Sequence, residues 1–144
     1  MTPEAILSAM LDNDPFSQWL GVVCTHLAPG TCTLEATVRS EMTNGFGVAH
    51  GGITYSLADS ALAFASNSHG QHAVSVETSI AHTAPIRTGD RLEAIATEDQ
   101  RSKQFARYTV RVTANGERLA GSARINAANP GKRWKKQTWD LSAY

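Results

Sequence analysis

One short stretch of the chain gathers residue types that can perform acyl-transfer chemistry. It reads Asn44-Gly45-Phe46-Gly47-Val48-Ala49-His50-Gly51-Gly52, and the carboxylate Asp59 follows in the segment after it. If a helix begins at Gly51 or Gly52, its first N–H groups lack partners inside the helix and carry the positive end of its dipole. Glycine lets a substrate carbonyl approach such donors closely. We interpret this helix start as a candidate oxyanion hole; the alternative is that the two glycines only permit a tight turn.

The carboxylate of Asp59 is unexpected at its position in the chain. It lies in an apolar, small-residue segment, residues 53–65, with helical spacing and no Lys or Arg within helical reach. Burial of an unpaired carboxylate is costly and raises its pKa, and such groups collect at functional sites. Two readings stay open: Asp59 acts in catalysis, or it hydrogen-bonds backbone amides or a side chain of a partner subunit.

Other reaction chemistries lack their sequence patterns. The five histidines show no two-ligand helical spacing, and the two cysteines form no zinc motif. There is no phosphate-binding loop or dinucleotide fingerprint, and Ser56 and Ser60 lack the context of a hydrolase nucleophile. We therefore expect no metal and no cofactor. A carboxylate, an amide-rich helix start and an asparagine together suit acyl transfer to water.

The composition favours one ordinary globular domain spanning residues 1–144. The formal net charge is zero, so no bulk field attracts nucleic acid. A signal peptide and a membrane-spanning apolar run are both absent from the sequence, which predicts a cytoplasmic protein without membrane contact. Cys24 and Cys32 are expected to be free thiols.

The elements that must position these residues can be placed from periodicity and turn signals. We expect a short amphipathic helix over residues 3–12, strands over 20–27 and 31–39, the long helix, and then four strands. These four strands are expected at residues 73–83, 91–97, 105–113 and 118–126, and the Asn115-Gly116 pair predicts a hairpin between the last two. One helix inside one antiparallel sheet is an α+β arrangement.

The chain ends are expected to be peripheral to a core of about residues 15–126. Phe16 and Trp19 should anchor the turn that follows the first helix. The basic C-terminal extension, residues 127–144, should place Trp134 and Trp139 back onto the body of the protein.

The pattern from Asn44 through His50-Gly51-Gly52 to Leu57-Ala58-Asp59 resembles the hotdog-fold acyl-CoA thioesterases, in their phenylacetate-degradation (PaaI-like) branch. The resemblance covers roughly residues 15–126. It implies a long central helix wrapped by a mostly antiparallel sheet of five to six strands. It also implies that two subunits join their sheets edge to edge, and that homodimers pair into homotetramers.

The resemblance further implies a role for each matching residue. Asp59 would act as general base for water or as nucleophile on the thioester. The Gly51 N–H would polarise the thioester carbonyl, with His50 preceding it as in the family. Asn44 would orient the water or the thioester, and Ser75 would position water. Family sites combine two chains, which would explain why Asp59 lacks a partner on its own helix.

The expected substrate is an acyl-CoA with an aryl, aryl-acetyl or medium-chain acyl group. Phe46 stands where many relatives carry His, which would alter the acyl pocket. The CoA phosphates would need basic side chains. The residues expected to bind substrate are Phe46, Gly52, Tyr55, Arg87, Arg101, Lys103 and Arg124.

Three alternatives to an acyl-CoA thioesterase can be weighed. A hotdog dehydratase or hydratase would need an Asp and a His close together, whereas nine residues separate His50 and Asp59. A non-catalytic acyl-CoA sensor usually carries a DNA-binding domain, and the residues before Pro15 are too few for one. An inactive hotdog scaffold predicts that Asp59→Asn loses nothing.

Overall fold

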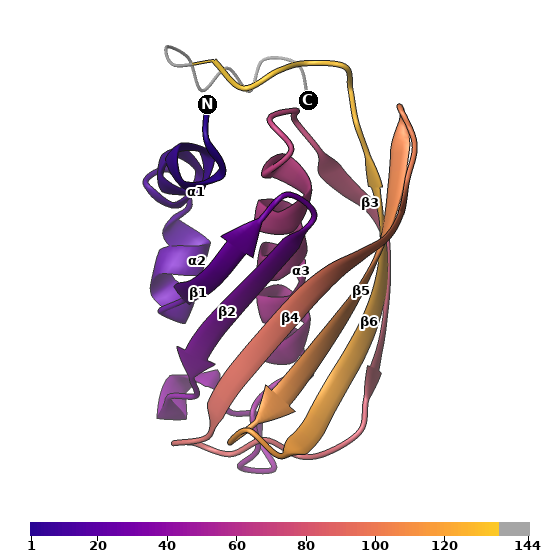
Figure 1. The fold of residues 1–144 in the computed structure, drawn as a ribbon. Helices are drawn as coiled ribbons and strands as arrows, with labels where there is room; N and C mark the ends of the chain where they lie inside the picture. The colour runs from indigo at the N-terminus through magenta and orange to yellow at the C-terminus, as the bar shows by residue number, and fades with distance from the viewer. Residues whose placement is uncertain (136–144) are drawn as a thin grey trace.

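A curved antiparallel sheet and one long helix form the body of the molecule in the computed structural model, which describes residues 1–135 (Figure 1). The elements follow in the order α1 (Pro3–Leu11), α2 (Pro15–Leu20), β1 (Val23–Ala28), β2 (Thr31–Thr37), the 3-10 helix η1 (Ser40–Met42), α3 (Gly51–Asn67), β3 (Val74–His82), β4 (Arg91–Arg101), β5 (Phe105–Ala114) and β6 (Arg118–Ala128). The six strands are ordered β1-β2-β4-β5-β6-β3, and every neighbouring pair is antiparallel. The predicted α+β arrangement is confirmed.

Helix α3 packs its apolar side against the inner face of the sheet. Leu57 and Leu62 are each 1 % exposed, and burying such a side chain contributes about 1.5–3 kcal/mol. The alanines of α3 let the strands come close. On the sheet, Ala94 lies opposite Val112 in the β4–β5 pair, and both are fully buried. Alternation along the strands thus supplies the surface that α3 covers.

The β5–β6 connection shows how local sequence sets the strand pairing. Asn115 and Gly116 adopt φ values of 55° and 76°, the left-handed conformation that Asn and Gly tolerate in tight turns. With Glu117 they form the three-residue connection between Ala114 and Arg118, which pair with each other. The predicted Asn-Gly hairpin is confirmed. Strand β4 is longer than predicted, because its polar end from Glu98 to Arg101 continues to pair with β5 past a bulge.

The residues before β1 differ from the expectation. Asp14 and Pro15 start a second helix, α2, which turns Ser17 and Leu20 inward. Phe16 and Trp19 therefore face outward, 51 % and 44 % exposed, with their rings stacked on each other at 5.9 Å. The prediction that these two aromatic side chains anchor a turn is wrong.

The chain beyond β6 returns across the C-terminal end of α3 (Figure 1). Trp134 is buried there; its Nε1–H donates to Asn67 Oδ1 at 2.9 Å, and its ring stacks on His72. The prediction for Trp134 is confirmed, while Trp139 lies outside the described residues. Cys24 and Cys32 are free thiols with their Sγ atoms 3.9 Å apart.

None of the helices within residues 1–135 is long and apolar enough to cross a membrane.

Candidate active site

The first turn of α3 begins at Gly51, the earlier of the two starts, Gly51 and Gly52, that the sequence predicts. His50 is the N-cap, and its Nδ1 accepts a hydrogen bond from the Gly52 N–H at 2.9 Å. Because Nδ1 is the acceptor, the proton of the neutral His50 ring is on Nε2. The Ile53 N–H donates to the His50 carbonyl at 2.9 Å. Within residues 1–135 the Gly51 N–H has no partner, so this helix start offers one backbone donor to a ligand.

The loop before α3 is held by Asn44. Its Oδ1 accepts from the Phe46 N–H at 2.9 Å, and its backbone N–H donates to the Val48 carbonyl at 2.8 Å. The Asn44 Nδ2 amide bonds to no other residue in the described part of the chain. Phe46, at the tip of the loop, is 91 % exposed. The loop therefore presents an amide donor and an uncovered aromatic ring.

Asp59 lies two turns further along α3, on a stripe that its own chain leaves partly exposed. This stripe repeats at helical spacing as Gly52, Tyr55, Asp59 and Ala63, and Tyr55 is 39 % exposed. The Asp59 Oδ1 atom is nevertheless buried and has no hydrogen-bond partner among residues 1–135. Burial raises the pKa of Asp59, and hydrogen bonding by the Ser75 side chain on β3 partly opposes this rise. The structure thus brings Ser75 to Asp59.

Gly51 and Asp59 of one chain are too far apart to act on the same atom. Eight residues separate them on a continuous helix, which corresponds to about 12 Å along its axis. A thioester carbonyl that accepts a hydrogen bond from the Gly51 N–H therefore lies beyond reach of the Asp59 carboxylate in that chain.

A pocket of about 360 Å³ opens beside Gly51. It is lined among others by Val48, Ala49, Thr54, His82 and Pro85. Sequence reasoning missed His82, because neither its spacing nor its neighbours in the chain suggest chemistry. It could have been found only from the strand pairing, which places the end of β3 over the start of α3.

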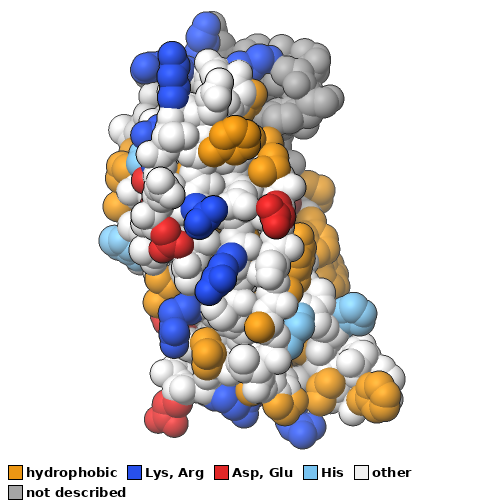
Figure 2. Space-filling view, turned by 90° about the vertical axis from the view of Figure 1, so that its right-hand side faces the viewer, with side chains coloured by type: hydrophobic (Ala, Val, Ile, Leu, Met, Phe, Trp, Pro, Cys, Tyr) orange, Lys and Arg blue, Asp and Glu red, His pale blue; other side chains and the backbone are white. Residues whose placement is uncertain are grey.

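The four basic residues expected at the CoA phosphates do not come together within one chain. Arg87 follows Ile86, whose carbonyl accepts from Ala49 just before the start of α3. At the opposite end of that helix, Arg101 donates to Gln71, with Lys103 close by in the β4–β5 turn. Arg124 is exposed on β6. On the one face of the molecule that Figure 2 shows, Lys and Arg side chains are spread out and mixed with acidic ones.

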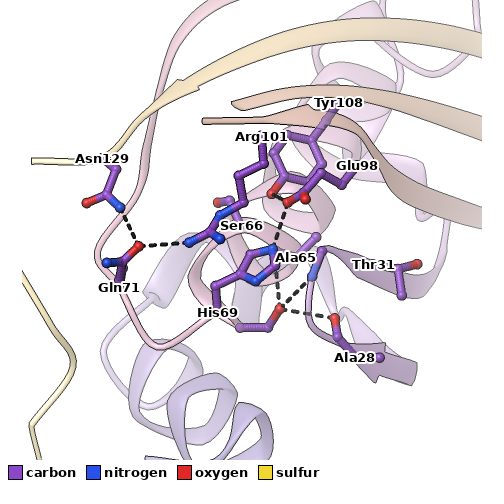
Figure 3. A network of polar contacts seen from close by, with 12 residues as sticks. Ala28, Thr31, Ala65, Ser66, His69, Gln71, Glu98, Arg101, Tyr108 and Asn129 are labelled. Atoms are coloured by element: carbon purple, nitrogen blue, oxygen red, sulfur yellow. Dashed lines mark hydrogen bonds and ion pairs between the residues drawn. The ribbon is translucent and has the colours of Figure 1, made fainter. Parts of the chain in front are cut away.

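A polar network closes the C-terminal end of α3 (Figure 3). Glu98 Oε2 accepts from the Tyr108 hydroxyl at 2.6 Å and contacts His69 Nε2 at 2.7 Å. Burial, reinforced by Glu98, raises the pKa of Tyr108, so its hydroxyl remains a donor. Gln71 Oε1 accepts from Arg101 and from Asn129. The network joins β4, β5 and the α3–β3 connection, and its polar groups satisfy one another.

Within residues 1–135, no group of three or more His, Cys, Asp and Glu side chains is arranged to hold a metal ion.

Comparisons with known proteins agree with this geometry. Residues 46–120 match the family model of the thioesterase superfamily. The chain is 36% identical to the acyl-coenzyme A thioesterase PaaI of Escherichia coli over 104 residues, 72% of this chain and 74% of that protein. It is 31% identical to human acyl-coenzyme A thioesterase 13 over 120 residues, 80% of this chain and 86% of that one. The structure of the E. coli PaaI protein superposes with a TM-score of 0.88 at 30% identity, covering 91% of this chain and 95% of that one.

A long helix wrapped by a six-stranded antiparallel sheet is a hotdog fold, and the family match together with the acyl-CoA thioesterase relatives makes it that of a thioester hydrolase. The chain belongs to the thioesterase superfamily. The resemblance to the PaaI-like branch is confirmed.

Proposed function

We propose that the protein hydrolyses an acyl-CoA thioester to the free acid and CoA. The observation that carries the proposal is the Asp59 carboxylate, whose Oδ1 is buried without a partner in the described part of the chain. A fold gains no stability from such a group, whereas a general base or nucleophile must be free to meet its substrate. The names of the E. coli and human relatives support CoA as the thiol.

The site forms between two copies of the chain. Since Gly51 and Asp59 of one chain are about 12 Å apart, the carbonyl held at Gly51 meets the Asp59 of a second copy. Strand β3 is an edge of the sheet, and its Ser75 reaches Asp59. Pairing of two β3 edges extends the sheet and covers the open stripe of α3. Homodimers of this kind pair into homotetramers.

Hydrolysis then follows ordinary acyl-transfer chemistry. In the general-base route, Asp59 takes a proton as water oxygen bonds to the thioester carbon, and the oxyanion that develops is stabilised by the Gly51 N–H. The C–S bond breaks as the tetrahedral intermediate collapses, and the proton passes to the CoA sulfur. In the nucleophile route, an Asp59 oxygen bonds to the thioester carbon, the C–S bond breaks and CoA leaves as the thiolate. Water then hydrolyses the mixed anhydride, which frees the acid, regenerates the Asp59 carboxylate and supplies the proton that the CoA sulfur takes. Asn44 and Ser75 orient the water, and His50 fixes the first turn of α3.

The substrate lies across residues from several elements. Phe46, Gly52 and Tyr55 contact the acyl end, which is an aryl, aryl-acetyl or medium-chain group. The phosphates of CoA meet basic side chains drawn from Arg87, Arg101, Lys103 and Arg124. No metal or cofactor takes part in the proposed reaction, and the protein works in the cytoplasm.

Free-thiol release from a panel of aromatic and aliphatic acyl-CoAs tests the proposal. We expect Asp59→Asn to lower kcat by about 10²- to 10⁴-fold, as loss of a general base does, without change in oligomer size. Asp12→Asn, an exposed carboxylate at the end of α1, is the matched control and should retain wild-type kcat. Equal turnover by wild type and Asp59→Asn would exclude the assigned role of Asp59. Binding of acyl-CoA without any thiol release would instead favour a binding module.

A further inference from the structure

We propose that His82 is a second catalytic donor, whose Nε2–H hydrogen-bonds the thioester carbonyl oxygen alongside the Gly51 N–H. The inference rests on the proposed thioester hydrolysis and adds a residue to it.

Strand pairing turns His82 toward the first turn of α3. In the β3–β6 ladder His82 lies opposite Gly121, and directly opposite residues of an antiparallel pair share a face of the sheet. A Cβ at Gly121 would lie 2.9 Å from Thr54 Cγ2, so this row of the sheet faces α3. His82 therefore belongs to the inner face, although it sits near the end of an edge strand.

The imidazole edge that carries Nε2 lies against Gly51. A Cβ at Gly51 would meet His82 Nε2 at 3.2 Å, Cε1 at 3.3 Å and Cδ2 at 3.7 Å. Glycine at position 51 thus leaves the space that the imidazole occupies. This close contact places the His82 ring beside Gly51, the residue whose N–H is the proposed backbone donor.

Unlike His50 and His69, His82 has no partner among residues 1–135. His50 Nδ1 accepts from Gly52, and His69 Nε2 contacts Glu98. No hydrogen bond or ion pair engages the His82 ring in the described chain. Its ring nitrogens are therefore available to a ligand.

The surroundings of His82 suit an acyl group with one polar anchor. The pocket of about 360 Å³ falls within the size range of small-ligand sites, and its walls include Val48, Ala49 and Pro85. None of its lining residues is acidic or basic apart from His82. A carbonyl held at the Gly51 N–H lies at the mouth of this pocket, beside the imidazole.

Two donors stabilise a developing oxyanion better than one. The His82 Nε2–H keeps its proton throughout: it donates a hydrogen bond to the oxygen as the tetrahedral intermediate forms and releases it when the C–S bond breaks. Loss of one oxyanion donor typically lowers kcat by about 10²- to 10³-fold.

The test compares His82→Phe, which fills the ring space without a donor, with His82→Gln, whose amide N–H restores one. Thiol release is measured with phenylacetyl-CoA and octanoyl-CoA. We expect His82→Phe to lower kcat by about 10²-fold with KM within about threefold, and His82→Gln to recover at least tenfold of that loss. His82→Ala removes the exposed ring together with its donor, so its kcat should resemble that of His82→Phe. Oligomer size and thermal unfolding are measured for each variant.

The outcomes separate this inference from the function on which it rests. Wild-type kcat in His82→Phe, or equal kcat in the Phe and Gln variants, overturns the role of His82 while leaving thioester hydrolysis in place. No thiol release by the wild type from either substrate overturns both.

Discussion

At the C-terminal end of α3 the polar side chains bond to one another, whereas at the N-terminal end the Gly51 N–H and the His82 ring have no partner in the described part of the chain and lie beside a pocket. Both ends carry an imidazole. His69 is tied to Glu98, which also accepts from the buried Tyr108 (Figure 3). His82 lies against Gly51 with no partner among residues 1–135. Satisfied polar groups stabilise and rigidify a fold, while unsatisfied ones retain their capacity to bind. Under the proposed function, the C-terminal end of α3 is thus its structural end and the N-terminal end its chemical end.

Truncation of Trp134, which is buried at the structural end of α3, should give the largest effect. Trp134→Ala removes a buried indole and its hydrogen bond to Asn67, and we expect a loss of about 3–5 kcal/mol in free energy of unfolding. The kcat of the folded fraction should stay at the wild-type value. Urea unfolding at fixed protein concentration measures the first quantity and thiol release the second.

Trp19→Ala is the matched control for this change, because the Trp19 side chain is 44 % exposed and should cost much less. A fall in kcat of the folded Trp134→Ala protein would show that the two ends of α3 are coupled. It would contradict the separation of a structural end from a chemical end.

A methyl group added at the chemical end of α3 should lower kcat and leave stability nearly unchanged, the reverse of the effect of Trp134→Ala. Gly51→Ala places a Cβ 3.2 Å from the His82 ring, and we expect kcat to fall by about 10²-fold with little change in the free energy of unfolding. In a His82→Ala background the same substitution should cost less, because the atoms that the methyl group meets are gone. Additive effects of the two substitutions would contradict the contact between these residues.

The pH dependence that follows from Asp59 should be the smallest of these effects. Burial raises the pKa of Asp59 above its ordinary value of 3.8. In the proposed mechanism the ionised form of Asp59 is the active one, so kcat/KM should rise with pH through an apparent pKa above 3.8. The folded state binds the proton more tightly than the unfolded state, so the contribution of Asp59 to stability should fall as pH rises from 3.8 through the raised pKa.

Asp59→Asn should lack this fall in stability, which pH-dependent unfolding of the two proteins can measure. An apparent pKa at or below 3.8 in the rate profile would show that Asp59 is solvated in the active assembly.

The sequence predicted the local features because each depends on neighbouring residues. Helical spacing and the glycine pair predicted the start of α3 at Gly51 or Gly52, and Asn115-Gly116 predicted a hairpin turn. Local signals were weaker where polar residues pair across strands: the end of β4 from Glu98 to Arg101 read as a break but continues as strand. Phe16 and Trp19 were misplaced because the helical phase of α2, not hydrophobicity, decides which side faces inward.

The sequence by itself determined the class of fold, the helix that carries Asp59 and the donor at its start. Only the tertiary structure decided that His82 lies against Gly51, that Ser75 reaches Asp59, and that Arg87 is far from Arg101 and Lys103. The physical reason is the sheet order: β3 crosses to pair with β6 rather than with a neighbour in the chain. Which side chains meet across that crossing depends on the register of distant segments, and no periodicity within either segment encodes it.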